Sequence, residues 1–144
     1  MDTDTLPMPT LRRARTLSVG IAAPFSTVYA FVSDARSLPE WAHGLGASPR
    51  PLGDNRWELA TAAGPVDVEF AAPNTFGVVD HVVTPTSGGA PVDVPMRVLK
   101  NGEGSEVLFT LFQQPGMTDE QFAQDAALVD ADLARLKQRL ERAS

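Results

Sequence analysis

The chain has 144 residues, of which 43% are hydrophobic and 21% are charged. This length and composition are typical of a single globular domain and exclude wholesale disorder and a fibrous repeat. Twelve basic and eighteen acidic side chains give a net charge of -6, which has the wrong sign for binding a phosphate backbone, so no nucleic acid partner is expected. The absence of cysteine excludes disulfides, thiolate nucleophiles and cysteine-bound metals.

The first segment is predicted to be a loose tail at residues 1–9 followed by a strand from about Leu11 to Ile21. The tail carries two prolines and two aspartates without an apolar period, whereas the strand alternates apolar and polar residues. Three arginines precede the apolar stretch, as in a signal peptide. The alternation, and Pro24 where a cleavage site would lie, favour a strand and therefore a cytoplasmic protein. No apolar run approaches the roughly 20 residues of a membrane-spanning helix.

Two short helices and a meander of strands are predicted next. Pro24 suits the first turn of a helix, and apolar residues then recur at positions 25, 28, 29 and 32 on one face. A second helical turn is expected before Trp41. From Ala47 to Gln113 the residues alternate with period two between turn-forming segments, which predicts antiparallel strands. These turns are expected at Pro51–Asn55, Ala62–Pro65, Pro73–Asn74, Pro85–Pro91 and Asn101–Gly102.

The strongest local signal predicts a long C-terminal helix. Thr118 is a suitable N-cap, and Gln121 three residues later completes a capping box. Apolar residues follow at spacings of three and four to about Ala143, while the acidic residues are assigned to the solvent face. The apolar stripe consists of Phe122, Ala126, Val129, Leu133, Leu136 and Leu140. A coiled coil would use a similar stripe, but a sheet with an uncovered face needs this helix in the same domain.

Four groups of residues, together with the order of these elements, carry a resemblance to a known family. They are Ala23-Pro24 through Asp34, Leu38–Trp41, Met96–Val98 with Asn101-Gly102, and Phe109–Gln113 leading into Pro115–Met117. Over roughly residues 11–141 the chain resembles the START-like superfamily, also called SRPBCC. The resemblance implies an α+β helix-grip domain at residues 10–144, in which a curved antiparallel sheet of about six to seven strands wraps around the C-terminal helix and encloses an apolar cavity.

Turn geometry predicts which side chains face the interior, because loops of even length keep the two faces of a hairpin distinct. A two-residue loop at Asn101–Gly102 places Arg97 beside Glu106 on the solvent face. The opposite, inner face then carries Val94, Met96, Val98, Ser105, Val107 and Phe109. The hairpin at residues 62–65 likewise places Trp57, Leu59, Val66, Val68 and Phe70 inward.

The same register, carried across Pro73–Asn74, pairs Val68 with Val79 and Val66 with His81. His81 is therefore predicted to point inward, and its neighbour Asp80 to point outward beside Asp67. An inward imidazole can donate, accept or transfer a proton, which makes His81 the candidate catalytic residue. A core histidine with its hydrogen bonds satisfied is the alternative.

The remaining candidate ligand contacts are mainly apolar and aromatic. They are Trp41, His43, Trp57, Val79, Met96 and Phe109. Simple surface exposure is the alternative for His43, and ordinary core packing is the alternative for Trp57. No metal or other cofactor is expected, because the two histidines are distant in sequence without an obvious third ligand, and no dinucleotide or phosphate-loop motif occurs.

Three classes of function fit these features. The leading one is binding of a small or medium apolar or amphipathic molecule, such as a lipid, an isoprenoid or an aromatic polyketide. The resemblance also suggests a polyketide cyclase or dehydratase in which His81 acts as acid or base. A third class is an interaction module similar to chaperone activators, which works through its sheet surface. The sequence does not predict the oligomeric state.

Overall fold

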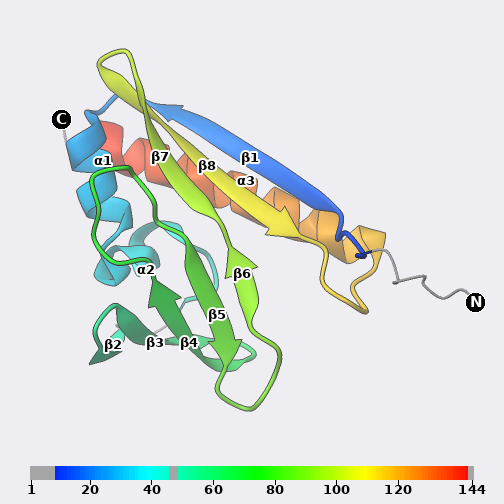
Figure 1. Cartoon of the computed structure of the whole chain (residues 1–144). Helices are drawn as coiled ribbons and strands as arrows, with labels where there is room; N and C mark the ends of the chain where they lie inside the picture. The colour runs from blue at the N-terminus through cyan, green and yellow to red at the C-terminus, as the bar shows by residue number, and fades with distance from the viewer. Residues whose placement is uncertain (1–8, 46–48, 143–144) are drawn as a thin grey trace, which may run out of the picture.

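The computed structural model describes residues 9–45 and 49–142 (Figure 1). Its helical segments are α1 (Phe25–Val32), the 3-10 turn η1 (Ala35–Ser37), α2 (Leu38–Trp41) and α3 (Asp119–Arg142). Its strands are β1 (Ala14–Ile21), β2 (Arg50–Gly53), β3 (Arg56–Thr61), β4 (Gly64–Phe70), β5 (His81–Pro85), β6 (Val92–Val94), β7 (Met96–Asn101) and β8 (Gly104–Phe112). Most of the predicted tail, the start of the predicted meander at residues 47–48 and the predicted helix end at residue 143 lie outside the described residues.

The two short helical segments predicted after the first strand are present. Pro24 precedes α1, and its carbonyl oxygen accepts a hydrogen bond from the Val28 N–H at 3.0 Å. The carboxylate of Asp34 accepts the Arg36 N–H at 3.0 Å, which begins η1 and leads directly into α2. Trp41, the last residue of α2, is only 3% exposed. Because α2 contacts α3, this segment places Trp41 against the long helix.

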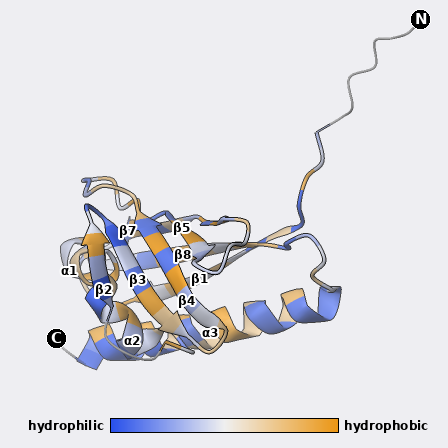
Figure 2. Cartoon of the chain, turned by 90° about the horizontal axis from the view of Figure 1, so that it is seen from below, coloured by the Kyte–Doolittle hydropathy of each residue, from blue (hydrophilic) through white to orange (hydrophobic). Residues whose placement is uncertain are grey.

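Helix α3 begins with the predicted capping box. The Gln121 N–H donates to Thr118 Oγ1 at 3.1 Å, and the Thr118 N–H donates to Gln121 Oε1 at 2.9 Å. All six residues of the predicted apolar stripe are buried, and α3 packs against β1, β8 and α2. Figure 2 shows hydrophobic and hydrophilic residues alternating along this helix. One acidic residue departs from the prediction, because Asp132 is also buried, with 6% exposed.

The strands form two hydrogen-bonded antiparallel sheets (Figure 1). One has the order β1-β8-β7 and the other the order β2-β3-β4-β5-β6. The chain passes from one sheet to the other at Pro95, which lacks the N–H needed to continue a strand ladder. The Pro95 carbonyl still accepts the Thr110 N–H at 3.0 Å, so this segment remains beside β8. The predicted α+β helix-grip architecture is confirmed, and the eight strands of the described residues slightly exceed the predicted six to seven.

The β7–β8 hairpin keeps the predicted faces but has a different register. Its loop is Gly102–Glu103, so that Met96 lies opposite Phe109 and Arg97 lies opposite Leu108. This register differs from the predicted one by two residues, and an even shift leaves each side chain on its original face. The inner-face residues Met96, Val98, Ser105 and Val107 are accordingly buried.

The predicted pairing of Arg97 with Glu106 is wrong. Arg97 instead forms two hydrogen bonds with the carboxylate of Asp80, at 3.0 and 2.8 Å. The Asp80 carboxylate also accepts the Met96 N–H at 2.9 Å. The guanidinium hydrogen bond is the main cause that lowers the pKa of Asp80. The predicted pairing failed because the shifted register places Leu108 opposite Arg97. The contact with Asp80 joins two different hairpins, so the register within one hairpin cannot reveal it.

The β4–β5 pair shows a second register difference with the same consequence. Phe70 lies opposite His81 and Val68 opposite Val83, a shift of four residues from the predicted pairing. Because the shift is again even, His81 keeps its predicted inward direction. Asp80 does not lie beside Asp67, whose partner across the strands is Thr84.

The loop between β4 and β5 joins the two sheets. The Val98 N–H of β7 donates to the Gly77 carbonyl at 2.8 Å, and the Val79 N–H donates to the Met96 carbonyl at 2.9 Å. The side chain of Asn74 holds this loop by accepting the Val78 N–H at 3.1 Å. Gly77 has a φ of +78°, a conformation that side chains with a Cβ rarely adopt.

Within the described residues, none of the helices combines the length and the apolar character needed to cross a membrane.

Candidate ligand cavity

A cavity of about 450 Å³ lies between α2, the segment that follows it, the inner face of the sheet and α3. It is lined by Leu38, Trp41, Ala42, His43, Leu45, Leu59, Thr61, Val66, Val68, His81, Val83, Val92, Phe109, Asp125 and Asp132. Most of these side chains are apolar, and the five polar residues come from four separate segments. Such a lining is typical of a small-molecule site, in which apolar walls hold the ligand and a few polar groups orient it.

The structure brings four of the seven predicted site residues to this cavity. Trp41, His43, His81 and Phe109 line it. The remaining three lie elsewhere. Val79 and Met96 are packed in the core with 2% exposed each. Trp57 lines a separate hollow of about 90 Å³ together with Tyr29 and Phe70.

His81 is held in one orientation in the cavity wall. Its Nδ1 lies 2.9 Å from the Val79 carbonyl oxygen, and because a carbonyl can only accept, Nδ1 carries the proton. The ring lies against Phe70 at 5.1 Å and Phe109 at 6.3 Å between ring centroids. Nε2 has no hydrogen-bond partner among the described residues. Nε2 is therefore free to accept a hydrogen bond, in a ring that lines the cavity.

Burial lowers the pKa of His81 below its ordinary value. The hydrogen bond to Val79 and the charge of Asp80 act in the opposite direction, but desolvation is the largest of the three effects. The ring is thus neutral near pH 7, with Nε2 as a hydrogen-bond acceptor.

We expect His81→Leu to lower the free energy of unfolding by about 1 to 3 kcal/mol at pH 8, because the Val79 carbonyl loses its hydrogen bond. Below about pH 6.5, His81 binds a proton in the unfolded wild-type chain but remains neutral in the folded chain. The free energy of unfolding of the wild-type protein therefore falls as the pH falls. The difference between the two proteins should therefore shrink as the pH falls through this range. Urea unfolding from pH 8 to pH 5 measures it. A constant or growing difference would mean that His81 is protonated in the folded state.

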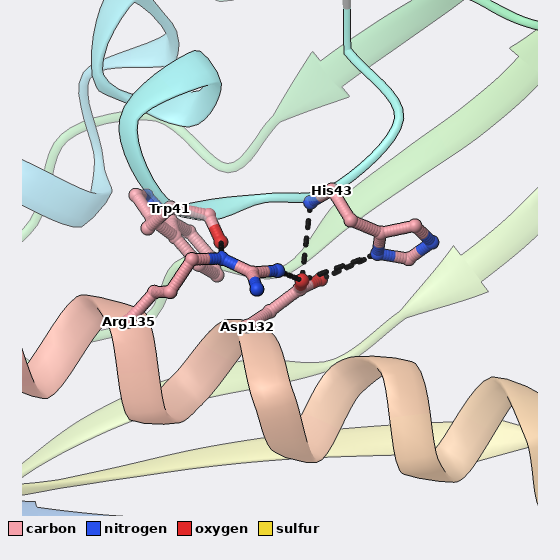
Figure 3. Close-up of polar contacts among 4 residues, drawn as sticks. All are labelled: Trp41, His43, Asp132 and Arg135. Atoms are coloured by element: carbon pink, nitrogen blue, oxygen red, sulfur yellow. Dashed lines mark hydrogen bonds and ion pairs between the residues drawn. The ribbon is translucent and has the colours of Figure 1, made fainter.

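His43 is fixed by a carboxylate that the sequence analysis placed in solvent. Its Nδ1 lies 3.0 Å from Asp132 Oδ2, and its backbone N–H donates to Asp132 Oδ1 at 3.1 Å. The side chain of Asp132 is 9% exposed and that of His43 is 45% exposed. Figure 3 shows the imidazole with Nδ1 turned toward Asp132 and the other ring nitrogen turned away from it. His43 is thus an exposed residue that is fixed at the cavity wall by a buried aspartate.

Asp132 could have been found from helical spacing. It lies three residues after Val129 and four before Leu136, both in the apolar stripe, so it must share their face. A carboxylate on such a face requires partners, because an unpaired buried charge is costly. Arg135, one turn further along α3, supplies a second partner to Asp132. The same guanidinium donates to the Trp41 carbonyl at 3.1 Å, which ties the end of α2 to α3 (Figure 3).

Two further polar residues complete the lining. The Thr61 hydroxyl donates to the Gly64 carbonyl at 2.5 Å. Asp125 lies two helical turns before Asp132, and no hydrogen bond or ion pair to it is present among the described residues. The lining contains no lysine or arginine within the described part of the chain. In the same residues, no group of three or more histidine, aspartate or glutamate side chains could hold a metal ion.

A second hollow, of about 440 Å³, lies outside the core between α1, η1 and α3. Its charged residues are already paired with one another. Arg36 binds Asp34 at 2.9 Å and Arg139 binds Glu40 at 2.7 Å. The cavity under the sheet, with its apolar walls and unpaired acceptors, is the better candidate site.

Comparison with solved structures identifies the fold. A START superfamily protein from Mycobacterium smegmatis aligns with a TM-score of 0.75 at 12% identity, covering 91% of this chain and 99% of that chain. An uncharacterized protein from Bacillus thuringiensis aligns with a TM-score of 0.70 at 17% identity, covering 89% and 98%. The di-domain ARO/CYC StfQ from the steffimycin biosynthetic pathway aligns with a TM-score of 0.69 at 11% identity, covering 89% of this chain and 44% of that chain.

No protein-family model matches the sequence, and no curated protein matches it. The fold is nevertheless established by the structures, and the chain has the START-like, or SRPBCC-like, helix-grip fold.

Proposed function

We propose that this protein binds a small or medium apolar or amphipathic molecule in the cavity between the sheet and α3. The observation that carries the proposal is the cavity itself, whose lining combines apolar walls with a few convergent polar groups. Its volume of about 450 Å³ falls in the lower part of the range of roughly 300–1,000 Å³ that is typical of ligand sites. The size favours an aromatic polyketide or a short isoprenoid over a lipid with two long chains.

The similar structures support this proposal at the level of the fold. One is described as a START superfamily protein and another as an ARO/CYC of a biosynthetic pathway. Because folds of this kind accommodate many functions, the identity of the ligand has to come from the side chains of the cavity.

We expect the fluorescent probe N-phenyl-1-naphthylamine to bind, because it is uncharged and largely apolar. Val83 lines the cavity, so Val83→Trp should fill part of it and weaken binding by roughly tenfold or more. A fluorescence titration measures the affinity. Val82→Trp is the matched control, because the side chains of adjacent strand residues point to opposite faces. It should leave the affinity unchanged.

Thermal unfolding of both variants checks that each is folded. If the wild-type protein binds no probe, or if Val82→Trp and Val83→Trp weaken binding equally, the cavity is not the binding site. The third class of function, an interaction module that uses the sheet surface, would then be favoured.

Proton-transfer catalysis of the cyclase or dehydratase type is a second candidate, favoured by the His43–Asp132 pair. A carboxylate bonded to Nδ1 stabilises the imidazolium that forms when Nε2 takes a proton. This role suits His43 better than His81, because burial opposes protonation of His81. A reaction intermediate that copurifies with the protein, identified by mass spectrometry, would favour this candidate, whereas a mixture of lipids would favour a carrier.

A further inference from the structure

We propose that the cavity selects an uncharged ligand with a hydroxyl or amino hydrogen-bond donor, such as a phenol or an alcohol, and rejects ligands that carry a carboxylate, such as fatty acids. This inference rests on the proposed binding function and specifies the class of ligand. It follows from the polar atoms that the lining presents, because nearly all of them are acceptors.

The two imidazoles both present a lone pair. His81 Nδ1 donates its hydrogen to the Val79 carbonyl, and Nε2 remains as a hydrogen-bond acceptor. His43 Nδ1 donates its hydrogen to Asp132, because a carboxylate can only accept, and this tautomer leaves the ring's lone pair at Nε2. Both hydrogen bonds fix the tautomer, so neither ring can offer an N–H at Nε2 without taking up a proton.

Thr61 and Asp125 add further acceptors. The Thr61 hydroxyl donates its hydrogen to the Gly64 carbonyl, so Oγ1 can only accept a hydrogen bond from a ligand. Asp125 and Asp132 contribute carboxylates, which accept only when ionised. A ligand hydroxyl or amine thus finds acceptors in the cavity wall, whereas an ether or ketone oxygen finds no side-chain donor among those described above.

Trp41 is the single exception in the described lining. Its indole Nε1–H has no hydrogen-bond partner, but the nitrogen is covered by neighbouring atoms. A ligand therefore cannot reach this N–H in the observed arrangement of side chains.

The charged residues that line the cavity also favour an uncharged ligand. The guanidinium of Arg135 offsets the charge of Asp132, but the carboxylate of Asp125 has no such partner among the described residues. A ligand carboxylate in the cavity would meet this unpaired negative charge, and the two like charges would repel each other. An uncharged ligand avoids this cost.

The test uses three naphthalenes of similar size: 2-naphthol is a donor, 2-methoxynaphthalene is only an acceptor, and 2-naphthoate is an anion. Isothermal titration calorimetry at pH 8 measures their affinities for the wild-type protein. We expect 2-naphthol to bind roughly tenfold more tightly than 2-methoxynaphthalene, and 2-naphthoate to bind most weakly. His43→Phe keeps an aromatic ring without the acceptor and should reduce the preference for 2-naphthol.

The variant Asp125→Asn tests the effect of charge with little change in shape. It should tighten 2-naphthoate binding by about threefold or more and leave 2-naphthol binding unchanged. Asp130→Asn is the control, because Asp130 lies on the exposed side of the same helix. Equal or tighter binding of 2-naphthoate or 2-methoxynaphthalene by the wild-type protein overturns this inference alone. If none of the three naphthalenes binds, the proposed binding function is wrong and the inference fails with it.

Discussion

Replacing Leu133 with aspartate is expected to abolish cooperative folding or to lower the free energy of unfolding by roughly 4 kcal/mol or more. Leu133 is 1% exposed at the centre of the buried stripe of α3. The new carboxylate would have no partner there, and it would also remove the apolar contacts of the leucine. Such a loss approaches the total stability of a typical domain. Thermal unfolding followed by circular dichroism measures it.

Leu128→Asp is the matched control for this change. It lies on the same helix but is 43% exposed, so the added charge remains in contact with water. We expect its unfolding midpoint to stay close to that of the wild-type protein. If Leu133→Asp also unfolded at the wild-type midpoint, α3 would not be packed under the sheet, and the cavity described here would not exist.

Replacing Gly77 with alanine is expected to cause the second large loss, of about 3 kcal/mol or more in the free energy of unfolding. A Cβ at this position would lie 2.1 Å from the Val98 carbonyl oxygen and 2.9 Å from the ring of Phe25. The backbone cannot move away easily, because the Gly77 carbonyl accepts the Val98 N–H at 2.8 Å. Relieving the clash would break the connection between the two sheets.

Gly88→Ala separates this clash from the cost of the backbone conformation alone. Gly88 also has a positive φ, +92°, but a Cβ there would meet no atom within 4 Å. We expect its substitution to cost about 1 kcal/mol. Urea unfolding of both variants gives the comparison. Equal losses in the two variants would contradict the close approach of this loop to β7.

Local features of the sequence were sufficient to predict the long helix. The capping box joins Thr118 to Gln121 over three residues, and the apolar stripe repeats every three or four residues, so both signals depend on neighbours along the chain. The inward direction of His81 was predicted for a related reason. Successive strand residues alternate between faces, and this alternation survives a register error of two or four residues.

The residue pairs across neighbouring strands could not be predicted from the alternation of apolar and polar residues. They depend on the exact position of each turn. The loop of the β7–β8 hairpin is Gly102–Glu103, one residue later than predicted, and this moved each cross-strand pair. The contact between Arg97 and Asp80 joins residues seventeen positions apart on different hairpins. Only the packing of the loop after β4 against β7 brings them together.

The candidate site itself was decided by the tertiary structure. His43 and Asp132 lie 89 positions apart in the sequence, and their contact requires that α3 dock beside the segment after α2. The sequence by itself determined the helix, the faces of the strands and the exclusion of cysteine chemistry, because these follow from composition and from periodicity along the chain. The docking of distant elements decided which side chains share the cavity, because burial and electrostatic partners depend on the assembled fold.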